Sequence, residues 1–69
     1  LKAVLEYGFE QMQLNRIQAI IDSENSRSIK LVQRLGFTHE GVLRQNSHFN
    51  GQLRDDVVFS LLKTEWTRS

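Results

Sequence analysis

Two residues at the start of a predicted helix, Asn25 and Ser28, are the best placed in this chain to do chemistry. They follow the polar loop Asp22-Ser23-Glu24 and precede an apolar repeat that ends at Gly36. Backbone N–H groups at a helix N-terminus point outward without partners and carry partial positive charge. Such an end suits a bound anion, an amide carbonyl or a thiolate. The same spacing also describes a plain helix cap, in which Asn25 accepts from the Ser28 amide, and it leaves both interpretations open.

Other polar side chains fit structural roles better than catalytic ones. Glu40 is expected to be a structural acceptor or an exposed strand residue, and His48 an ordinary exposed histidine of a hairpin. Asp55 and Asp56 are adjacent in a predicted strand and therefore point to opposite faces, which favours an ion pair with Arg54 over a metal pair. A solvated helix face is favoured over contact with a cofactor phosphate for three cations: Arg27, Lys30 and Arg34.

The first half of the chain predicts a helix, a strand and a second helix. A helix is expected over residues 1–13, because apolar residues recur there at helical spacing. Gly8 weakens such a helix by about 1 kcal/mol relative to Ala, unless another element packs close against it. The short β-branched run 16–21 predicts a buried strand. The second helix runs from about 26 to 35, capped by Asn25 and stopped by Gly36, and Phe37 can fold back onto it.

The second half of the chain predicts a long β-hairpin that turns at Asn50-Gly51. Pairing outward from that turn gives three opposed pairs: Phe49 and Gln52, Ser47 and Arg54, and Leu43 and Val58. We expect bulges near Gly41 or in the stretch 46–48. The apolar run 57–62 should be buried by other parts of a domain or by another chain. Trp66 is expected to be a core or interface residue.

The order helix, strand, helix, strand, strand predicts an α/β (α+β) fold with a mixed sheet, to which the hairpin adds an antiparallel edge. A strand–helix–strand connection favours parallel strands joined by a right-handed crossover. The chain opens at Leu1, without Met and in mid-helix, and no strand precedes the first helix. We therefore expect residues 1–69 to be the C-terminal part of a single domain whose N-terminal half lies outside this chain.

Composition argues against several classes of protein. The 69 residues include no Cys, so there is neither a disulfide framework nor a thiolate zinc site, and His39 and His48 cannot close a structural metal site alone. The net charge of +1 gives no electrostatic basis for nucleic-acid binding, and no apolar run is long enough to span a membrane. A cytoplasmic protein is the default expectation. Open strand edges favour a homo-oligomer or completion by the missing N-terminal half.

Four motifs, in order along the chain, carry a resemblance to a known family. They are Leu14-Asn15-Arg16-Ile17, Asn25-x-x-Ser28 followed by Leu35-Gly36-Phe37, Glu40-Gly41-Val42-Leu43-Arg44, and Phe49-Asn50-Gly51-x-x-x-Asp55. Over nearly all of its length the chain resembles the C-terminal half of a Gcn5-related N-acetyltransferase (GNAT), of the RimJ/RimL type that acetylates ribosomal proteins. The resemblance implies that these motifs are the entry to the family's fifth strand, the next helix, and the closing hairpin.

The resemblance implies transfer of an acetyl group from acetyl-coenzyme A (acetyl-CoA), the cosubstrate, to a protein N-terminal α-amine or a small amine, with no metal. In the family, the residue matching Asn25 hydrogen-bonds the pantetheine arm, which enters between the fourth and fifth strands. The residue matching Ser28 is implied as a catalytic donor to the departing thiolate. Val32 stands where many relatives use a Tyr, and Ser47 where some have a Glu base. The pyrophosphate loop is absent, so the isolated chain should be inactive.

A second hypothesis treats the chain as a non-catalytic module derived from the same fold. On that view the retained half serves dimerisation or another interaction, and its hairpin pairs with a second copy.

Overall fold

The computed structural model describes residues 2–68, which form an α+β arrangement of helices and three strands. The elements are α1 (Lys2–Glu6), a π-helical turn η1 (Tyr7–Gln11), β1 (Arg16–Asp22), α2 (Ser26–Arg34), β2 (Thr38–Phe49), β3 (Gln52–Leu62) and α3 (Lys63–Arg68). The expected α+β class and the order of helix, strand, helix and hairpin are confirmed. No helix within these described residues is long and apolar enough to cross a bilayer.

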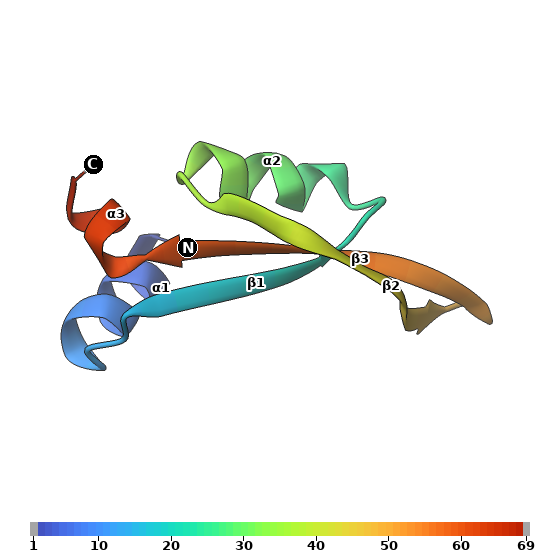
Figure 1. Cartoon of the computed structure of the whole chain (residues 1–69), viewed down its shortest axis with the longest axis horizontal. Helices are drawn as coiled ribbons and strands as arrows, with labels where there is room; N and C mark the ends of the chain where they lie inside the picture. The colour runs from blue at the N-terminus through green and yellow to red at the C-terminus, as the bar shows by residue number, and fades with distance from the viewer. Residues whose placement is uncertain (1, 69) are drawn as a thin grey trace.

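The strands form one sheet in the order β1-β3-β2, and both pairings are antiparallel. The expected mixed sheet is therefore not formed by the described strands. β3 returns between the other two strands instead of adding an edge, so β1 and β2 run in the same direction without pairing (Figure 1). As a result β3 is the central strand, with β1 paired along one edge and β2 along the other.

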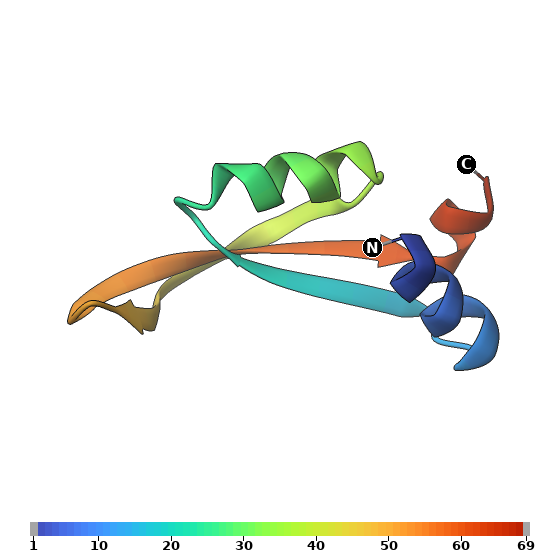
Figure 2. The same ribbon diagram turned by 180° about the vertical axis from the view of Figure 1, so that it is seen from behind.

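The helices lie over one side and at one end of this sheet. Figure 2 shows α2 lying along the sheet, α1 beside α3 at one end of the strands, and the tip of the hairpin projecting at the other end. β1 stops at Asp22, opposite Asp56, so the part of the hairpin beyond that pair extends past the end of β1.

The hairpin turns at Asn50-Gly51 as expected, with positive φ at both residues. The pairs Phe49–Gln52 and Ser47–Arg54 are confirmed, whereas the predicted pairing of Leu43 with Val58 is wrong. Two irregularities shift the register, one between His39 and Gly41 and one between Leu43 and Ser47. The first lies where a bulge was expected, and the second begins nearer the start of β2 than the stretch 46–48. The second irregularity alone brings Leu43 opposite Asp56, because it lies between Leu43 and the turn.

The core lies between the helices and one face of the sheet. The register of β1 and β3 places three pairs of core side chains on that face: Ile17 with Leu61, Ala19 with Phe59, and Ile21 with Val57. Phe9 and Phe59 are almost fully buried there, and Trp66 stacks on Phe9 with 5.3 Å between ring centroids. Trp66 is thus a core residue, as predicted. The apolar run 57–62 is covered in part by this chain: Phe59 and Leu61 are buried in the core with the helices, whereas Leu62 is 43% exposed.

The first helix is shorter and less regular than the predicted 1–13, because α1 passes into the π turn η1, which ends at Gln11. The close packing of β1 against the helix explains why position 8 is a glycine. A Cβ on Gly8 would lie 2.9 Å from Ile17 Cδ1 and 3.4 Å from Leu14 Cδ1, so β1 packs directly onto the helix backbone. The predicted exception for close packing is confirmed. Leu1, at the start of the predicted helix, lies outside the described residues.

Candidate functional site

The loop between β1 and α2 ends at Asn25, whose side chain caps the helix. Asn25 Oδ1 accepts a hydrogen bond from the Ser28 amide at 3.2 Å, and the Asn25 carbonyl accepts from the Ile29 amide at 3.1 Å. The loop itself is tight, since the Asn25 amide donates to the Asp22 carbonyl at 2.9 Å. The cap predicted from the spacing is confirmed, and it fixes the direction in which Asn25 leaves the loop.

The same side chain is also open to solvent. Asn25 is exposed and lines a shallow hollow of about 290 Å³ together with Asp22, Glu24, Phe49 and Arg54. Capping uses only Oδ1, and within residues 2–68 the Nδ2 group has no hydrogen-bond partner. The cap and a ligand contact therefore use different atoms of one side chain, so the two interpretations left open by the sequence are compatible.

Ser28 lies in the first turn of α2 and is half-buried. Its amide is held by Asn25, while its hydroxyl makes no side-chain hydrogen bond to any described residue. Ser28 does not line the hollow that Asn25 lines. One turn further along, Val32 is a core residue, only 4% exposed. Of Ser28 and Val32, which lie one turn apart on the same side of α2, only Ser28 offers a polar group to a ligand.

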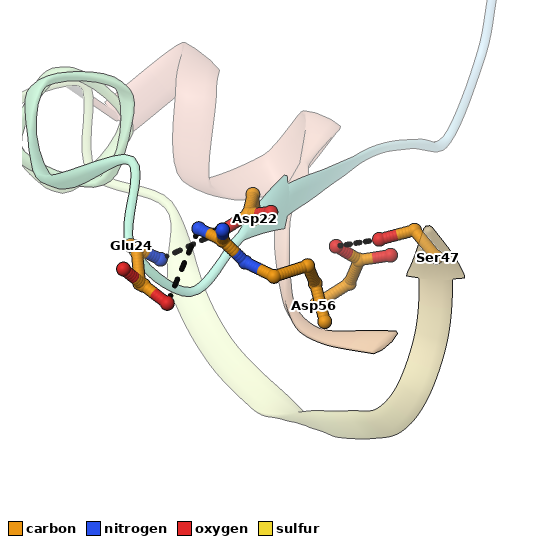
Figure 3. Close-up of polar contacts among 5 residues, drawn as sticks. Asp22, Glu24, Ser47 and Asp56 are labelled. Atoms are coloured by element: carbon orange, nitrogen blue, oxygen red, sulfur yellow. Dashed lines mark hydrogen bonds and ion pairs between the residues drawn. The ribbon is translucent and has the colours of Figure 1, made fainter. Parts of the chain in front are cut away.

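Two carboxylates of the loop converge on one arginine of the hairpin. Arg54 Nη2 lies 3.0 Å from Asp22 Oδ1 and 3.2 Å from Glu24 Oε2, and Figure 3 shows the Asp22 and Glu24 side chains drawn together at this point. Asp22 Oδ1 also accepts from the Glu24 amide at 2.8 Å. This amide, and to a lesser degree Arg54, lowers the pKa of Asp22, against the opposing effect of burial. The predicted pairing of Arg54 with Asp55 or Asp56 is wrong.

Asp55 and Asp56 instead hold the irregular part of β2. Asp56 is only 6% exposed; its Oδ2 accepts from Asn46 Nδ2 at 2.8 Å and its Oδ1 from Ser47 Oγ at 3.2 Å (Figure 3). Asp55 Oδ1 accepts from the Gln45 amide at 2.7 Å. Ser47, which the family resemblance aligns with a Glu base, thus donates its hydroxyl proton to a buried carboxylate. The two adjacent aspartates bind different residues of β2, and they do not act as a pair.

The remaining candidates take the structural places expected of them. Ser60 donates to Glu40, which makes Glu40 a structural acceptor, and His48 is exposed. A shallow hollow of about 410 Å³ on α2 is lined by Ser26, Arg27, Lys30, Leu31 and Arg34. Among the residues that the structure describes, no group of three or more His, Asp or Glu side chains could hold a metal ion.

Sequence reasoning missed the contacts that join the hairpin to the loop. Arg54 and Asp22 are 32 positions apart, and the Ser23 amide donates to the Asp55 carbonyl at 2.9 Å. Only the pair of acidic residues, Asp22 and Glu24, gave a signal that a cation should lie nearby. The identity of that cation depends on the register of β1 against β3 and on how far the hairpin projects beyond β1. Neither was predicted from the sequence.

Comparisons with known proteins point to one family. The profile of the family described as "Acetyltransferase (GNAT) domain" matches residues 1–38. The chain is 46% identical to "Uncharacterized N-acetyltransferase p20" of Bacillus licheniformis, over 91% of this chain and 35% of p20. It is 36% identical to "[Ribosomal protein uS5]-alanine N-acetyltransferase" of Escherichia coli, over 97% of this chain and 34% of that enzyme.

A solved structure shares the fold as well. The spermidine/spermine N-acetyltransferase SpeG from Vibrio cholerae, in complex with manganese ions, superposes with a TM-score of 0.92 at 25% identity, over 97% of this chain and 39% of SpeG. This chain therefore spans between a third and two fifths of the length of these proteins.

Proposed function

The chain belongs to the GNAT family of acetyltransferases, and on that premise we propose that it is the C-terminal part of an acetyl-CoA-dependent N-acetyltransferase domain. The domain would transfer the acetyl group of acetyl-CoA to an amine. The single observation that carries the assignment is the open junction at Asn25, which is capped through Oδ1 and keeps Nδ2 available beside a hollow. Residues before this chain would supply the rest of the cosubstrate site.

The residues present fit the cosubstrate. A pantetheine arm carries amide carbonyls, and Asn25 Nδ2 can donate a hydrogen bond to one of them at the mouth of the hollow. The first turn of α2 adds the positive end of a helix and the free hydroxyl of Ser28. When an amine attacks the thioester, negative charge leaves on sulfur, and a hydroxyl at a helix N-terminus stabilises it by donating a hydrogen bond. Ser28 is proposed for this catalytic role and Asn25 for binding.

The acceptor is proposed as an amine of one of two kinds. One relative is named for an alanine of ribosomal protein uS5 and a solved neighbour for spermidine and spermine, so a protein N-terminal α-amine and a small polyamine both suit the family. We place the enzyme in the cytoplasm, acting on these partners as a homo-oligomer or after completion by its N-terminal half, without a metal cofactor.

One observation favours the second hypothesis, an interaction module. The sheet exposes apolar side chains on two of its strands, with Ile20 and Val42 each 51% exposed. Such residues require a cover in the whole protein, which can be either the missing part of the domain or a second copy. The two functions differ in whether acetyl transfer occurs once the domain is complete.

Transfer can be tested in an assembled domain, in which this chain replaces the matched 63 residues of p20. Release of the coenzyme A thiol is followed with a peptide amine and with spermidine as acceptors. We expect turnover with at least one acceptor by the assembled domain and none by the isolated chain.

The same assay tests Ser28. Ser28→Ala should lower kcat by about tenfold, the effect of one lost hydrogen bond to a charged group, and change the KM for acetyl-CoA less. Ser26→Ala, one residue into α2, is the matched control and should leave both constants unchanged. A folded assembled domain that releases no thiol would favour the interaction module. An effect of Ser28→Ala on KM alone would remove its role at the sulfur.

A further inference from the structure

Arg54 lines the hollow beside Asn25 but has no role in the proposed chemistry. We infer that Arg54 is a positioning residue, by which the hairpin fixes the loop that presents Asn25 and Ser28 to the cosubstrate. The inference rests on the proposed function for its consequence, but its structural half can be measured without any ligand.

The geometry of the loop carries the first step. Residues 22–25 make one turn, in which the Glu24 amide donates to the Asp22 side chain and the Asn25 amide to the Asp22 carbonyl. Arg54 Nη2 contacts the carboxylates of both Asp22 and Glu24, at 3.0 and 3.2 Å. Asp22 is thus bonded at once to its own loop and to the hairpin. A displacement of Asp22 would move Asn25, and with it the cap of α2.

The surroundings of Arg54 carry the second step, because they hold the guanidinium in place. Its side chain is 18% exposed, and Cζ lies 5.5 Å from the centre of the Phe49 ring, within the range of a cation–π contact. The hairpin is tied to the loop a second time by the bond from the Ser23 amide to the Asp55 carbonyl. The loop is therefore anchored to β3 by main chain and side chain together.

Charge gives the third step. Without Arg54, two carboxylates would border the hollow beside Asn25 with no compensating cation. Coenzyme A carries several phosphate charges, so uncompensated carboxylates near its arm would repel it. Arg54 therefore favours binding in two ways, by ordering the loop and by neutralising its charge.

Only one nitrogen of Arg54 contacts the two carboxylates, so a conservative replacement of Arg54 is informative. Both ion contacts come from Nη2, while Nε is buried without a hydrogen-bond partner in the described chain. The ion contacts need one charged nitrogen, so Arg54→Lys should keep them and lose only the packing of the planar guanidinium on Phe49. Arg54→Gln should not, because it removes the charge.

Hydrogen exchange of the 69-residue chain measures the loop directly. In Arg54→Gln we expect the amides of Glu24, Asn25 and Ser28 to exchange about tenfold faster, because they depend on the anchored loop. Ladder amides of β1 and β3, such as those of Ala19 and Val58, should be unchanged. Arg54→Lys should stay within about threefold of the parent. Equal acceleration at all amides, or none in the loop, would overturn the inference.

Affinity for acetyl-CoA, measured on the assembled domain, tests the consequence. Arg54→Gln should weaken Kd about tenfold, and adding Asp22→Asn should recover part of that loss, because the double change removes the uncompensated charge. Arg44→Gln is the matched control: this exposed arginine of the same hairpin has no ion pair within residues 2–68. An unchanged Kd in Arg54→Gln would overturn the positioning role. A parent assembled domain that does not bind acetyl-CoA overturns the proposed function itself, and the inference with it.

Discussion

Asn25 uses its two side-chain atoms in different ways, and this division is the basis of the candidate site. Oδ1 satisfies an N–H of the first helical turn, which a cap must do, and Nδ2 is left for a ligand. A residue that only capped would lose nothing if Asp or Ser replaced it, because either can accept from the Ser28 amide. An Asn that also binds needs its amide nitrogen.

Asp22 gives a prediction at this scale, because its pKa is lowered in the folded chain. A carboxylate with a lowered pKa stabilises the fold above its ordinary value of 3.8, and this contribution is lost as pH falls through the lowered value. Between about pH 6 and pH 3, urea unfolding should therefore show a smaller loss of stability for Asp22→Asn than for the parent chain. Glu10→Gln, at an exposed residue of η1, is the control. Parallel losses in parent and Asp22→Asn would contradict the prediction.

The local contacts of the site could be predicted from the sequence, but its long-range contacts could not. The bond from Ser28 to Asn25 spans three residues and follows from the geometry of any helix start. The contact of Arg54 with Asp22 spans 32 residues and depends on where the hairpin lies. For the same reason we predicted an ion pair between Arg54 and its neighbours in the chain, Asp55 or Asp56, although strand alternation turns adjacent side chains to opposite faces.

The ends of elements could be predicted wherever glycine or asparagine adopts a positive φ. Gly36 ends α2 with φ of +91°, a conformation in which a Cβ is strained. Asn50-Gly51 sets the turn of the hairpin in the same way. The six residues of α3 gave no signal, because fewer than two turns are too few for periodicity. The sheet order could not be predicted either, because no local signal indicates that β3 pairs with both β1 and β2.

Gly36 provides a prediction about the end of α2. Gly36→Ala should lower the free energy of unfolding by about 1 kcal/mol, because alanine is strained at this φ. Gly41→Ala is the matched control, since a Cβ there meets no atom within 4 Å and should cost little. Urea unfolding of both variants makes the comparison. Equal stability of the two variants would mean that α2 ends without help from Gly36.

The irregular part of β2 depends on Asp56. Residues 44–46 have no partner in the register with β3, and side chains of β3 take over: Asp55 binds the Gln45 amide, and Asp56 binds Asn46 and Ser47. Asp56→Ala leaves two polar side chains without their buried acceptor. It should lower the free energy of unfolding by about 2 kcal/mol, and Asp56→Asn, which keeps one acceptor, by about half as much. Denaturation showing no loss in Asp56→Ala would mean that water replaces the carboxylate.

At the scale of the whole molecule, the chain corresponds to only part of the proteins that it resembles. It spans about a third of the length of p20 and of the uS5 alanine N-acetyltransferase. The core face of its sheet is well covered, while Ile20 and Val42 lie open. Capping, turn and hydrophobic signals agree along the chain and indicated the fold class, whereas the family was indicated by the resemblance of four motifs. The sequence did not identify which amine is the acceptor in the proposed reaction.

The most direct measurement is calorimetric titration of acetyl-CoA into the assembled domain, in which this chain completes p20, in parent and Asn25→Ala forms. We expect the parent to bind and Asn25→Ala to bind about 1–2 kcal/mol more weakly, with the isolated chain showing little binding. Asn25→Asp keeps the cap but lacks the donor nitrogen, so it should bind as weakly as Asn25→Ala. Equal affinity in all three forms of the assembled domain would show that Asn25 only caps the helix, and no binding by a folded parent would contradict the assignment of this junction to acetyl-CoA.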